Sequence, residues 1–304
     1  MKNNFLRQNV LPLLAALIWG TAFVAQSICA PHVPPFAFNA MRSLIAFVLL
    51  IGVSRAFDAI ARKRGREPKP TDRKSLILGG LCTGVFLAIA SNLQQIGLAG
   101  TAAGKAGFIT ALYVVLVPVL GIFLKRRASV QTWVSIAIAV VGLYLLCIKA
   151  GSSFTLETGD FFILLCAFFF ACQIMSIDHF GAWVDGIKLS CAQFLVAGLI
   201  STVLSALFET IDWAAVLSCI WPLLYVAVFS SCVAYTLQIL AQQASDPTVV
   251  TLLLSLESVF SVLAGAVILH EKLSGREYLG CLLMFAAVVL AQIPIRIGRK
   301  KRTS

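Results

Sequence analysis

Charged residues are scarce in this chain. Asp, Glu, Lys and Arg make up only 12% of its 304 residues, about half the share of a typical soluble domain, which is roughly 25%. Acidic residues are the rarer kind, with 13 Asp and Glu against 24 Lys and Arg. A soluble globular protein is excluded, because no single core could bury the many long apolar segments that remain.

The sequence also lacks the motifs of catalysis, metal binding and nucleotide hydrolysis. Its histidines, His32, His179 and His270, lie in or beside loops without an HExxH pattern, and there is no GxSxG or Walker-type GxxxxGK[ST]. The nine cysteines form no CxxC pair, and most lie in apolar runs, as small packing residues do. We therefore expect no catalytic residue, metal or cofactor, and no autonomous ATP-driven pump.

Long apolar runs are abundant. Hydrophobic residues make up 60% of the chain and the mean hydropathy is +0.94. Segments of about twenty apolar residues are long enough to cross the hydrocarbon core of a bilayer as helices. The sequence predicts ten spans, at residues 10–28, 36–54, 75–97, 104–124, 130–149, 159–177, 187–208, 219–242, 248–270 and 275–295.

The first run also resembles a signal peptide, because Lys2 and Arg7 precede it and small residues follow it. It is long enough to span, however, and it has a counterpart in the second half of the chain. We interpret it as a retained first membrane helix.

Lys and Arg are distributed unevenly between the two sides of the predicted spans. If both termini are inside, the inner segments hold 19 of the 24 cations, including the block at 55–74 and the tail at 296–302. The positive-inside rule then predicts an inner-membrane protein with both termini in the cytoplasm. The same rule explains the formal charge of +11 without a nucleic-acid partner, although the 55–74 block could also lie on anionic headgroups.

The chain contains an internal repeat. Residues 104–127 follow the same pattern as 248–272, and 134–146 match 279–291, while Trp19 aligns with Phe170 and Arg42 with Gln193. An odd number of spans per copy inverts the second copy in the membrane. We predict an all-α integral membrane protein of ten transmembrane helices in two inverted-topology repeats of five, at 11–149 and 159–295, with a basic tail at 296–304. We also expect spans 4 and 9 to pack around the axis between the repeats.

Several segments together carry a resemblance to a known family. They are LAALIWGTAF in the first span, FNAMRSLIAF in the second, AGFITALYVVLVPVLGIFL in the fourth and LESVFSVLAGAVIL in the ninth. The chain resembles the EamA-type ten-helix exporters of the drug/metabolite transporter superfamily. One departure is Ser258, which follows Glu257 where family members commonly have proline, so the helix kink that proline would supply is left open.

The resemblance implies export of small solutes, typically amino acids or related metabolites, by alternating access. It also implies a central cavity walled by spans 1, 3, 4, 6, 8 and 9, with spans 5 and 10 at the periphery.

Polar residues inside the predicted spans are candidates for that cavity, because such residues avoid lipid. Four of them, Ser231, Tyr235, Gln238 and Gln242, share one face of an α-helix in span 8. Simple interhelical hydrogen bonding is the alternative for any single Gln or Ser. The candidates for substrate binding or coupling are Glu257, Arg42, Trp19, Gln26, Asn92, Gln95, Tyr113, Gln173, Tyr235, Gln238 and Ser261.

Glu257 and Arg42 are the charged members of this set. Counting about 1.5 Å per residue, Glu257 lies near the middle of the bilayer and Arg42 about 9 Å from its outer edge. Glu257 could bind a cationic substrate group, carry a coupling proton or accept a structural hydrogen bond. Arg42 could reach toward Glu257 or extend outward to the membrane surface. Pro118, in the interior of span 4, predicts a bend.

These features predict a secondary transporter for a small-molecule substrate, embedded in the lipid bilayer. A passive channel or a membrane-embedded enzyme remains the alternative, and a homodimer is left open.

Overall fold

The computed structural model describes residues 6–65, 71–101, 103–126, 128–148, 157–268 and 274–293. Every regular element in these ranges is helical. Within the described ranges, nine helices are long and apolar enough to cross a membrane, and Val130–Leu146 is a shorter apolar helix. The ten-helix membrane fold expected from the hydropathy pattern is confirmed.

The first half of the chain begins with one π-helical turn and forms five spans. The elements are η1 (Leu6–Val10), α2 (Leu11–Cys29), α3 (Pro35–Lys63), α4 (Arg73–Leu98), α5 (Ala103–Ala111), α6 (Tyr113–Phe123) and α7 (Val130–Cys147). The fourth span is therefore two helices, α5 and α6, rather than one.

The second half forms the other five spans. The elements are α8 (Thr158–Phe180), α9 (Gly186–Phe208), the short α10 (Trp213–Ser218), α11 (Ile220–Tyr225), the π-helix η2 (Val226–Ala234), α12 (Tyr235–Gln242), α13 (Pro247–Leu254), α14 (Glu257–Ile268) and α15 (Gly275–Gln292). The eighth span joins α11, η2 and α12, and the ninth is broken between α13 and α14. The basic tail at 296–304, Lys149 and His270 lie outside the described residues.

The basic block at 55–74 is partly helical rather than a loop. Helix α3 continues past the expected end at 54 to Lys63, because residues 55–63 contain neither glycine nor proline. The turn after it contains Gly65 at a φ of +66°, a conformation that glycine adopts without steric cost. Within the added turns, Asp58 forms an ion pair with Lys188 at 3.1 Å.

Side chains at the helix starts satisfy backbone N–H groups that have no partner within the helix. Asp72 accepts a hydrogen bond from the Ser75 N–H at 2.7 Å at the start of α4. The hydrogen bonds from Ser75 lower the pKa of the Asp72 carboxyl group below its usual value. Glu209, after α9, accepts bonds from the Phe36 and Ala37 N–H groups at the start of α3, at 2.8 and 2.7 Å.

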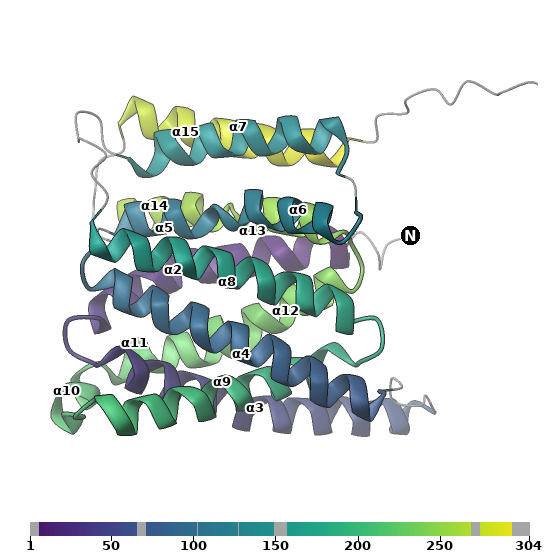
Figure 1. The fold of residues 1–304 in the computed structure, drawn as a ribbon, viewed down its shortest axis with the longest axis vertical. Coiled ribbons are helices and arrows are strands. Elements are labelled where there is room, and N and C mark those ends of the chain that lie inside the picture. The colour runs from purple at the N-terminus through teal and green to yellow at the C-terminus, as the bar shows by residue number, and fades with distance from the viewer. Residues whose placement is uncertain are drawn as a thin grey trace, which may run out of the picture.

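The helices are stacked in layers, and each layer contains helices from both halves of the chain (Figure 1). The most extensive contacts join α3 to α9, α4 to α8 and α15 to α7, each pair taken from both halves. The broken spans also meet, because α13 packs on α6 and α14 on α5. Spans 4 and 9 are therefore in contact, and their arrangement around an axis between the repeats stays a prediction.

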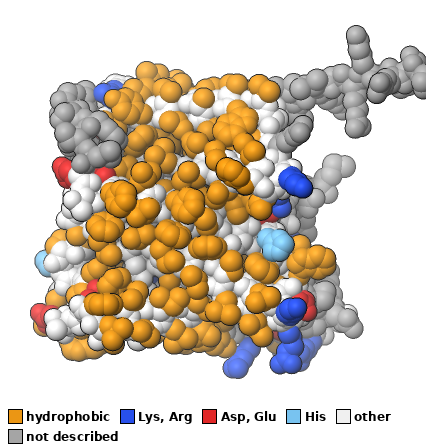
Figure 2. All heavy atoms as spheres, viewed as in Figure 1, with side chains coloured by type: hydrophobic (Ala, Val, Ile, Leu, Met, Phe, Trp, Pro, Cys, Tyr) orange, Lys and Arg blue, Asp and Glu red, His pale blue; other side chains and the backbone are white. Residues whose placement is uncertain are grey.

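The outer surface matches a bilayer. Figure 2 shows hydrophobic side chains across the middle of the visible face, with Lys, Arg, Asp and Glu gathered at the two edges where the helices end. Large apolar side chains remain exposed on this surface, among them Val48, Phe123 and Trp221. An exposed apolar surface of this kind is stable in contact with the hydrocarbon core of a bilayer.

Two glycines bring α4 and α9 together. A Cβ atom on Gly80 would lie 2.6 Å from the Cβ of Ala192, and one on Gly84 would lie 2.6 Å from the Cβ of Val196. Their GxxxG spacing places both on one face of α4, and the absence of side chains allows the close approach.

Candidate functional site

A central cavity of about 40 Å³ lies between the two halves of the chain. By the usual measure this volume holds a few water molecules. It is lined by residues of α2, α3, α4, α5, α6, α8, η2, α12, α13 and α14, namely Trp19, Phe23, Gln26, Arg42, Gln94, Thr110, Tyr113, Phe170, Gln173, Ile174, Ser230, Tyr235, Gln238, Leu254 and Glu257. These are the six spans that the resemblance implied, together with Arg42 from the second span.

Eight of the eleven predicted site residues line this cavity: Glu257, Arg42, Trp19, Gln26, Tyr113, Gln173, Tyr235 and Gln238. They come from segments far apart in the sequence, and the stacking of the two halves brings them together.

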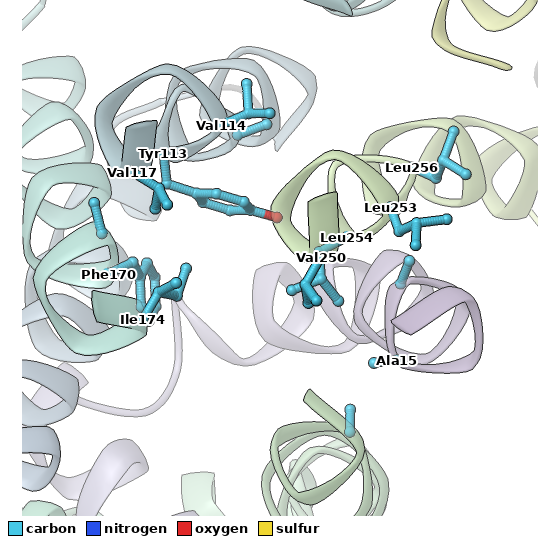
Figure 3. Packing of buried hydrophobic residues seen from close by; sticks show 14 of the residues in the cluster. Ala15, Tyr113, Val114, Val117, Phe170, Ile174, Val250, Leu253, Leu254 and Leu256 are labelled. Atoms are coloured by element: carbon cyan, nitrogen blue, oxygen red, sulfur yellow. The ribbon is translucent and has the colours of Figure 1, made fainter. Parts of the chain in front are cut away.

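Glu257 is the first residue of α14, immediately after the break in the ninth span. Its side chain is only 3% exposed. The Tyr113 hydroxyl, at the matching break of the fourth span, donates a hydrogen bond to Glu257 Oε1 at 3.1 Å. Figure 3 shows the Tyr113 ring pointing from α6 toward α13 among apolar neighbours. The two broken spans are thus joined at the cavity by one hydrogen bond to a carboxyl group.

Neither break is made by proline. Pro118 lies inside the continuous helix α6, and the chain breaks instead at Leu112, between α5 and α6. The ninth span breaks at Ser255 and Leu256 although Ser258 replaces the usual proline. Ser255 Oγ bonds back to the Leu252 carbonyl at 2.8 Å, a local contact that competes with the helical pattern. The break in the fourth span therefore does not coincide with Pro118, and the bend expected at Pro118 stays a prediction.

Arg42 is buried in the interior, with 2% of its surface exposed. Its Nη1 donates to Gln26 Oε1 at 3.0 Å, and its Nε has no hydrogen-bond partner. The reading in which Arg42 extends outward to the membrane surface is wrong, because its guanidinium lines the cavity. A direct pair with Glu257 is not formed either: the ion pairs among the described residues do not include Arg42.

The repeat equivalent of Arg42 makes a similar contact. Gln193, which aligns with Arg42, accepts a hydrogen bond through Oε1 from Gln173 Nε2 at 3.1 Å. Arg42 also bonds to a glutamine, Gln26, but as the donor. Each position therefore reaches a glutamine on the preceding span, but only the first half places a charge there.

Aromatic side chains form another wall of the cavity. The Trp19 and Tyr235 rings pack edge to face with centroids 4.8 Å apart, and Phe194 packs on the other side of Tyr235 at 5.4 Å. Trp19 Nε1 donates to the Ser230 carbonyl at 3.4 Å. Tyr235 lies close enough to both Arg42 and Glu257 to interact electrostatically with them.

The predicted polar face of span 8, made of Ser231, Tyr235, Gln238 and Gln242, lines the cavity only in part. Tyr235 and Gln238 line the cavity, but Ser230 lines it in place of Ser231, and Gln242 instead donates to the Ile174 carbonyl at 3.1 Å. The reason is the π-helix η2, whose wider turn shifts the residues that precede Tyr235. A stripe drawn with α-helical spacing misplaces them.

Three predicted residues lie outside the cavity. Asn92 accepts from Asn39 at 2.9 Å and donates to Ser201 at 3.0 Å, so it joins α4 to α3 and α9. Gln95 donates to the Gln26 carbonyl at 3.5 Å. Ser261 lies one turn beyond Glu257, where α14 packs on α2. For Asn92 and Gln95 the interhelical alternative is correct, because a polar face between helices looks the same in sequence as a polar face toward a cavity.

The sequence predictions missed several lining residues. Gln94 lines the cavity and donates to Thr110 Oγ1 at 3.4 Å. The prediction named its neighbour Gln95 instead, which lies on another face of α4. Phe170 could have been found as the repeat equivalent of Trp19. Thr110, Ile174 and Leu254 had no distinguishing signal.

A second cavity of about 250 Å³ lies at the end of α6, α8 and α13, and we call it the vestibule. Its lining includes Pro118, Arg126, Met175 and Asp246. At its edge Arg126 forms an ion pair with Asp178 at 2.5 Å. Lys125 makes this contact possible by adopting a φ of +61° after α6, which turns the chain back at the helix end.

Comparison with known proteins agrees with this geometry. Residues 7–148 and 157–292 match the family model described as the EamA-like transporter family. An uncharacterized transporter of Archaeoglobus fulgidus is 30% identical over 288 residues, which cover 93% of this chain and 84% of the relative. A probable amino-acid metabolite efflux pump of Salmonella typhimurium is 24% identical over 98% of this chain and 99% of its own.

A solved structure titled "Crystal structure of protein" has the same fold. The TM-score is 0.75 at 20% identity, and the match covers 94% of this chain and 96% of that one.

Proposed function

Because this chain belongs to the EamA-like transporter family, we propose that it exports small amino-acid-related metabolites through its central cavity. It is a multi-pass membrane transporter of small solutes and not an enzyme. The observation that carries the proposal is the cavity itself, where Glu257 at the break of the ninth span and Arg42 of the continuous helix α3 are both buried. Two relatives, from Salmonella typhimurium and Escherichia coli, are named probable amino-acid metabolite efflux pumps, which supports amino-acid metabolites as the solutes and export as the direction.

Glu257 is the proposed centre of the mechanism. A carboxyl group buried in a membrane span is unfavourable unless it has a function, and the Tyr113 hydroxyl donates a hydrogen bond to it. The side chain can bind a cationic group of the solute or take up a coupling proton. Either event changes the net charge at the Glu257 carboxyl group. This group lies at the contact between the two broken spans, where the two halves of the chain would separate.

We propose alternating access between the vestibule and the opposite side of the membrane. Tyr113 and Val117 of α6 lie one turn apart, the first in the central cavity and the second in the vestibule, and Ile174 and Met175 of α8 are divided in the same way. We propose that the apolar side chains packed between α6, α8 and α13, among them Val117, Ile174 and Val250 (Figure 3), form a layer between the two spaces. Separation of this layer would open the cavity to the vestibule.

The vestibule is proposed to face the cytoplasm. The basis is the excess of Lys and Arg in the segments on that side, in an inner membrane with both termini inside. Reporter fusions after Lys74 and after Ser304 should read as cytoplasmic, and one near Ser153 as external. An external signal at Lys74 would overturn the orientation. The division into repeats at 11–149 and 159–295 is part of the same proposal.

A metabolite screen tests the function. Intracellular and medium pools are compared between cells with and without overexpression, and Glu257→Gln is measured beside the native protein at equal expression. We expect amino-acid-related solutes to move to the medium with the native protein and to stay inside with the variant.

Glu277→Gln is the matched control for this change. Glu277 caps α15 through Ser274, away from the cavity, and glutamine can keep that capping arrangement. Near-normal export by the Glu257→Gln variant would show that transport does not depend on the Glu257 carboxyl group. Saturable counterflow in vesicles would exclude the passive-channel alternative.

A further inference from the structure

Two cysteines from opposite halves of the chain meet at one end of the molecule. Cys29 is the last residue of α2, and Cys219 joins α10 to α11. Cys29 is fully buried and Cys219 is 3% exposed. Cys29 Sγ lies 4.0 Å from the Cys219 carbonyl oxygen, and the two thiols are close enough to share a hydrogen bond. Both cysteines are free in this structure.

The pair lies on the side of the membrane opposite the vestibule. Before the start of α2, Gln8 Nε2 donates to the Ala244 carbonyl at 2.6 Å, close in sequence to Asp246 of the vestibule lining. Helix α2 then continues for 19 residues, or about 28 Å, to Cys29. Figure 1 agrees, with α10 at the left edge of the fold and α6 at the right. In the proposed orientation, the Cys29 side is the outside.

The same cysteines belong to a small apolar cluster that joins the two halves at this end. The cluster connects α2, α3 and the turn between them to α10, α11 and η2. Its buried members are Ala22, Cys29, Val33, Phe38, Val216, Cys219, Leu223 and Val226. Opening of the transporter to the outside would separate these residues, so a covalent bond between the two cysteines would prevent that opening.

Two other cysteine pairs among the described residues have thiols near each other, and both pairs lie inside spans. They are Cys82 of α4 with Cys172 of α8, and Cys191 of α9 with Cys232 of η2. A polar oxidant that stays in water does not reach the hydrocarbon region. These two pairs therefore serve as internal controls for a pair at the membrane surface.

We propose that Cys29 and Cys219 are a redox-sensitive pair whose disulfide links α2 to α11 and holds the outer end of the transporter closed. The outside of a membrane is where protein disulfides form and persist. The inference rests on the orientation and the alternating access of the proposed function. It adds a covalent control of the cycle by the redox state of the outer compartment.

The oxidant is a disulfide in the outer compartment, such as oxidised glutathione. Cys219 reacts first because it adjoins the exposed Ser218, whose Oγ lies 3.8 Å from its sulfur. The deprotonated Cys219 sulfur attacks one sulfur of the oxidant, and the other leaves as a thiol. The deprotonated Cys29 sulfur then attacks Cys219 Sγ in the mixed disulfide and releases the second thiol. Two protons and two electrons thus pass from the pair to the oxidant.

Peptide mapping of the full-length protein tests whether the bond forms. Right-side-out membrane vesicles are reduced, freed of reductant and treated with oxidised glutathione, and free thiols are then blocked with N-ethylmaleimide in denaturant. We expect the Cys29 and Cys219 peptides to be linked by a disulfide in most molecules. The two pairs inside the spans should stay unlinked, and inside-out vesicles should protect the outer pair from this impermeant oxidant.

Efflux from the same vesicles tests the lock. The probe is the radiolabelled solute that the metabolite screen identifies. Oxidation should lower its efflux roughly tenfold or more, because a disulfide keeps the two Cα atoms within about 7 Å of each other, and dithiothreitol should restore it. Cys29→Ala and Cys219→Ala should each keep efflux under oxidant. Cys281→Ala, on α15, is the matched control and should be inhibited as the native protein is.

Three results would overturn the inference. They are no Cys29–Cys219 link in right-side-out vesicles, equal linkage of the pairs inside the spans, and undiminished efflux by linked protein. If the alanine variants do not fold, recovery of the native protein in dithiothreitol decides. If the screen finds no exported solute, the proposed function fails, whereas the peptide map still decides whether the disulfide forms.

Discussion

Replacing Gly20 with alanine should force α2 away from α14 and destabilise the transporter. A Cβ atom at position 20 would lie 2.6 Å from the Glu257 carbonyl oxygen, 2.7 Å from the Phe260 Cβ and 2.8 Å from the Ser261 backbone nitrogen. Two of these three atoms belong to the backbone, so no rotation of a flexible side chain can relieve the contact.

The size of the effect follows from these distances. Ordinary contact begins at about 3.4 Å, so the helices must separate by roughly 0.8 Å at this point. Overpacking of this kind typically costs about 1–3 kcal/mol. In proteins of 150–250 residues each kcal/mol lowers the melting temperature by roughly 2–4 °C. Because the displaced backbone belongs to Glu257 itself, export should fall as well.

Thermal unfolding in detergent with a thiol-reactive dye measures the change. Buried cysteines such as Cys29, Cys166 and Cys219 react only when the helices separate. Gly52→Ala is the matched control, because a Cβ there meets nothing within 4 Å. Alanine favours a helix over glycine by about 0.5–1 kcal/mol, so the control should melt at or above the native temperature.

The two glycine variants are thus expected to differ in sign. If Gly20→Ala melts at the native temperature and exports at the native rate, the close packing of α2 on α14 is not a requirement, and the reasoning is refuted.

Two other substitutions test single contacts. Tyr113→Phe removes the hydrogen bond to Glu257. It should lower the free energy of unfolding by about 1.5–3 kcal/mol if the carboxyl group is charged, and it should slow export in the vesicle assay. An unchanged export rate would show that transport does not need this bond. Glu209→Ala removes the two hydrogen bonds from the Phe36 and Ala37 N–H groups. It should lower the free energy of unfolding by about 0.5–2 kcal/mol and leave export per folded molecule unchanged. A native melting temperature would show that water replaces the cap.

The spans could be predicted from sequence because the membrane imposes a length on every apolar run. The ends of the helices could not be predicted as well. The charged turns after position 54 continue α3 to Lys63, since nothing in residues 55–63 stops a helix and Lys188 stabilises the extension through Asp58.

The cavity residues were predictable where a polar or charged side chain sits in a single regular helix, as with Arg42 and Gln173. The prediction failed in two ways: on the regular helix α4 it chose the wrong polar face, with Asn92 and Gln95 in place of Gln94, and in span 8 the backbone departs from the α-helix. Ser231 was misplaced because η2 widens the helical turn, and hydropathy contains no signal for that. The break at Leu112 was missed for the same reason, as Pro118 was the more visible residue. Gln242 lies in the α-helix α12 but bonds to the Ile174 carbonyl instead of lining the cavity.

The pair α7 and α15 contributes no wall to the central cavity, yet it packs over α5, α13 and α14 (Figure 1). Those helices contain or flank the two breaks, where carbonyl groups lose their helical partners. Hydrocarbon tolerates such groups only when protein covers them. The outermost layer therefore separates the broken backbone from lipid, which gives a role to two helices that line no part of the central cavity.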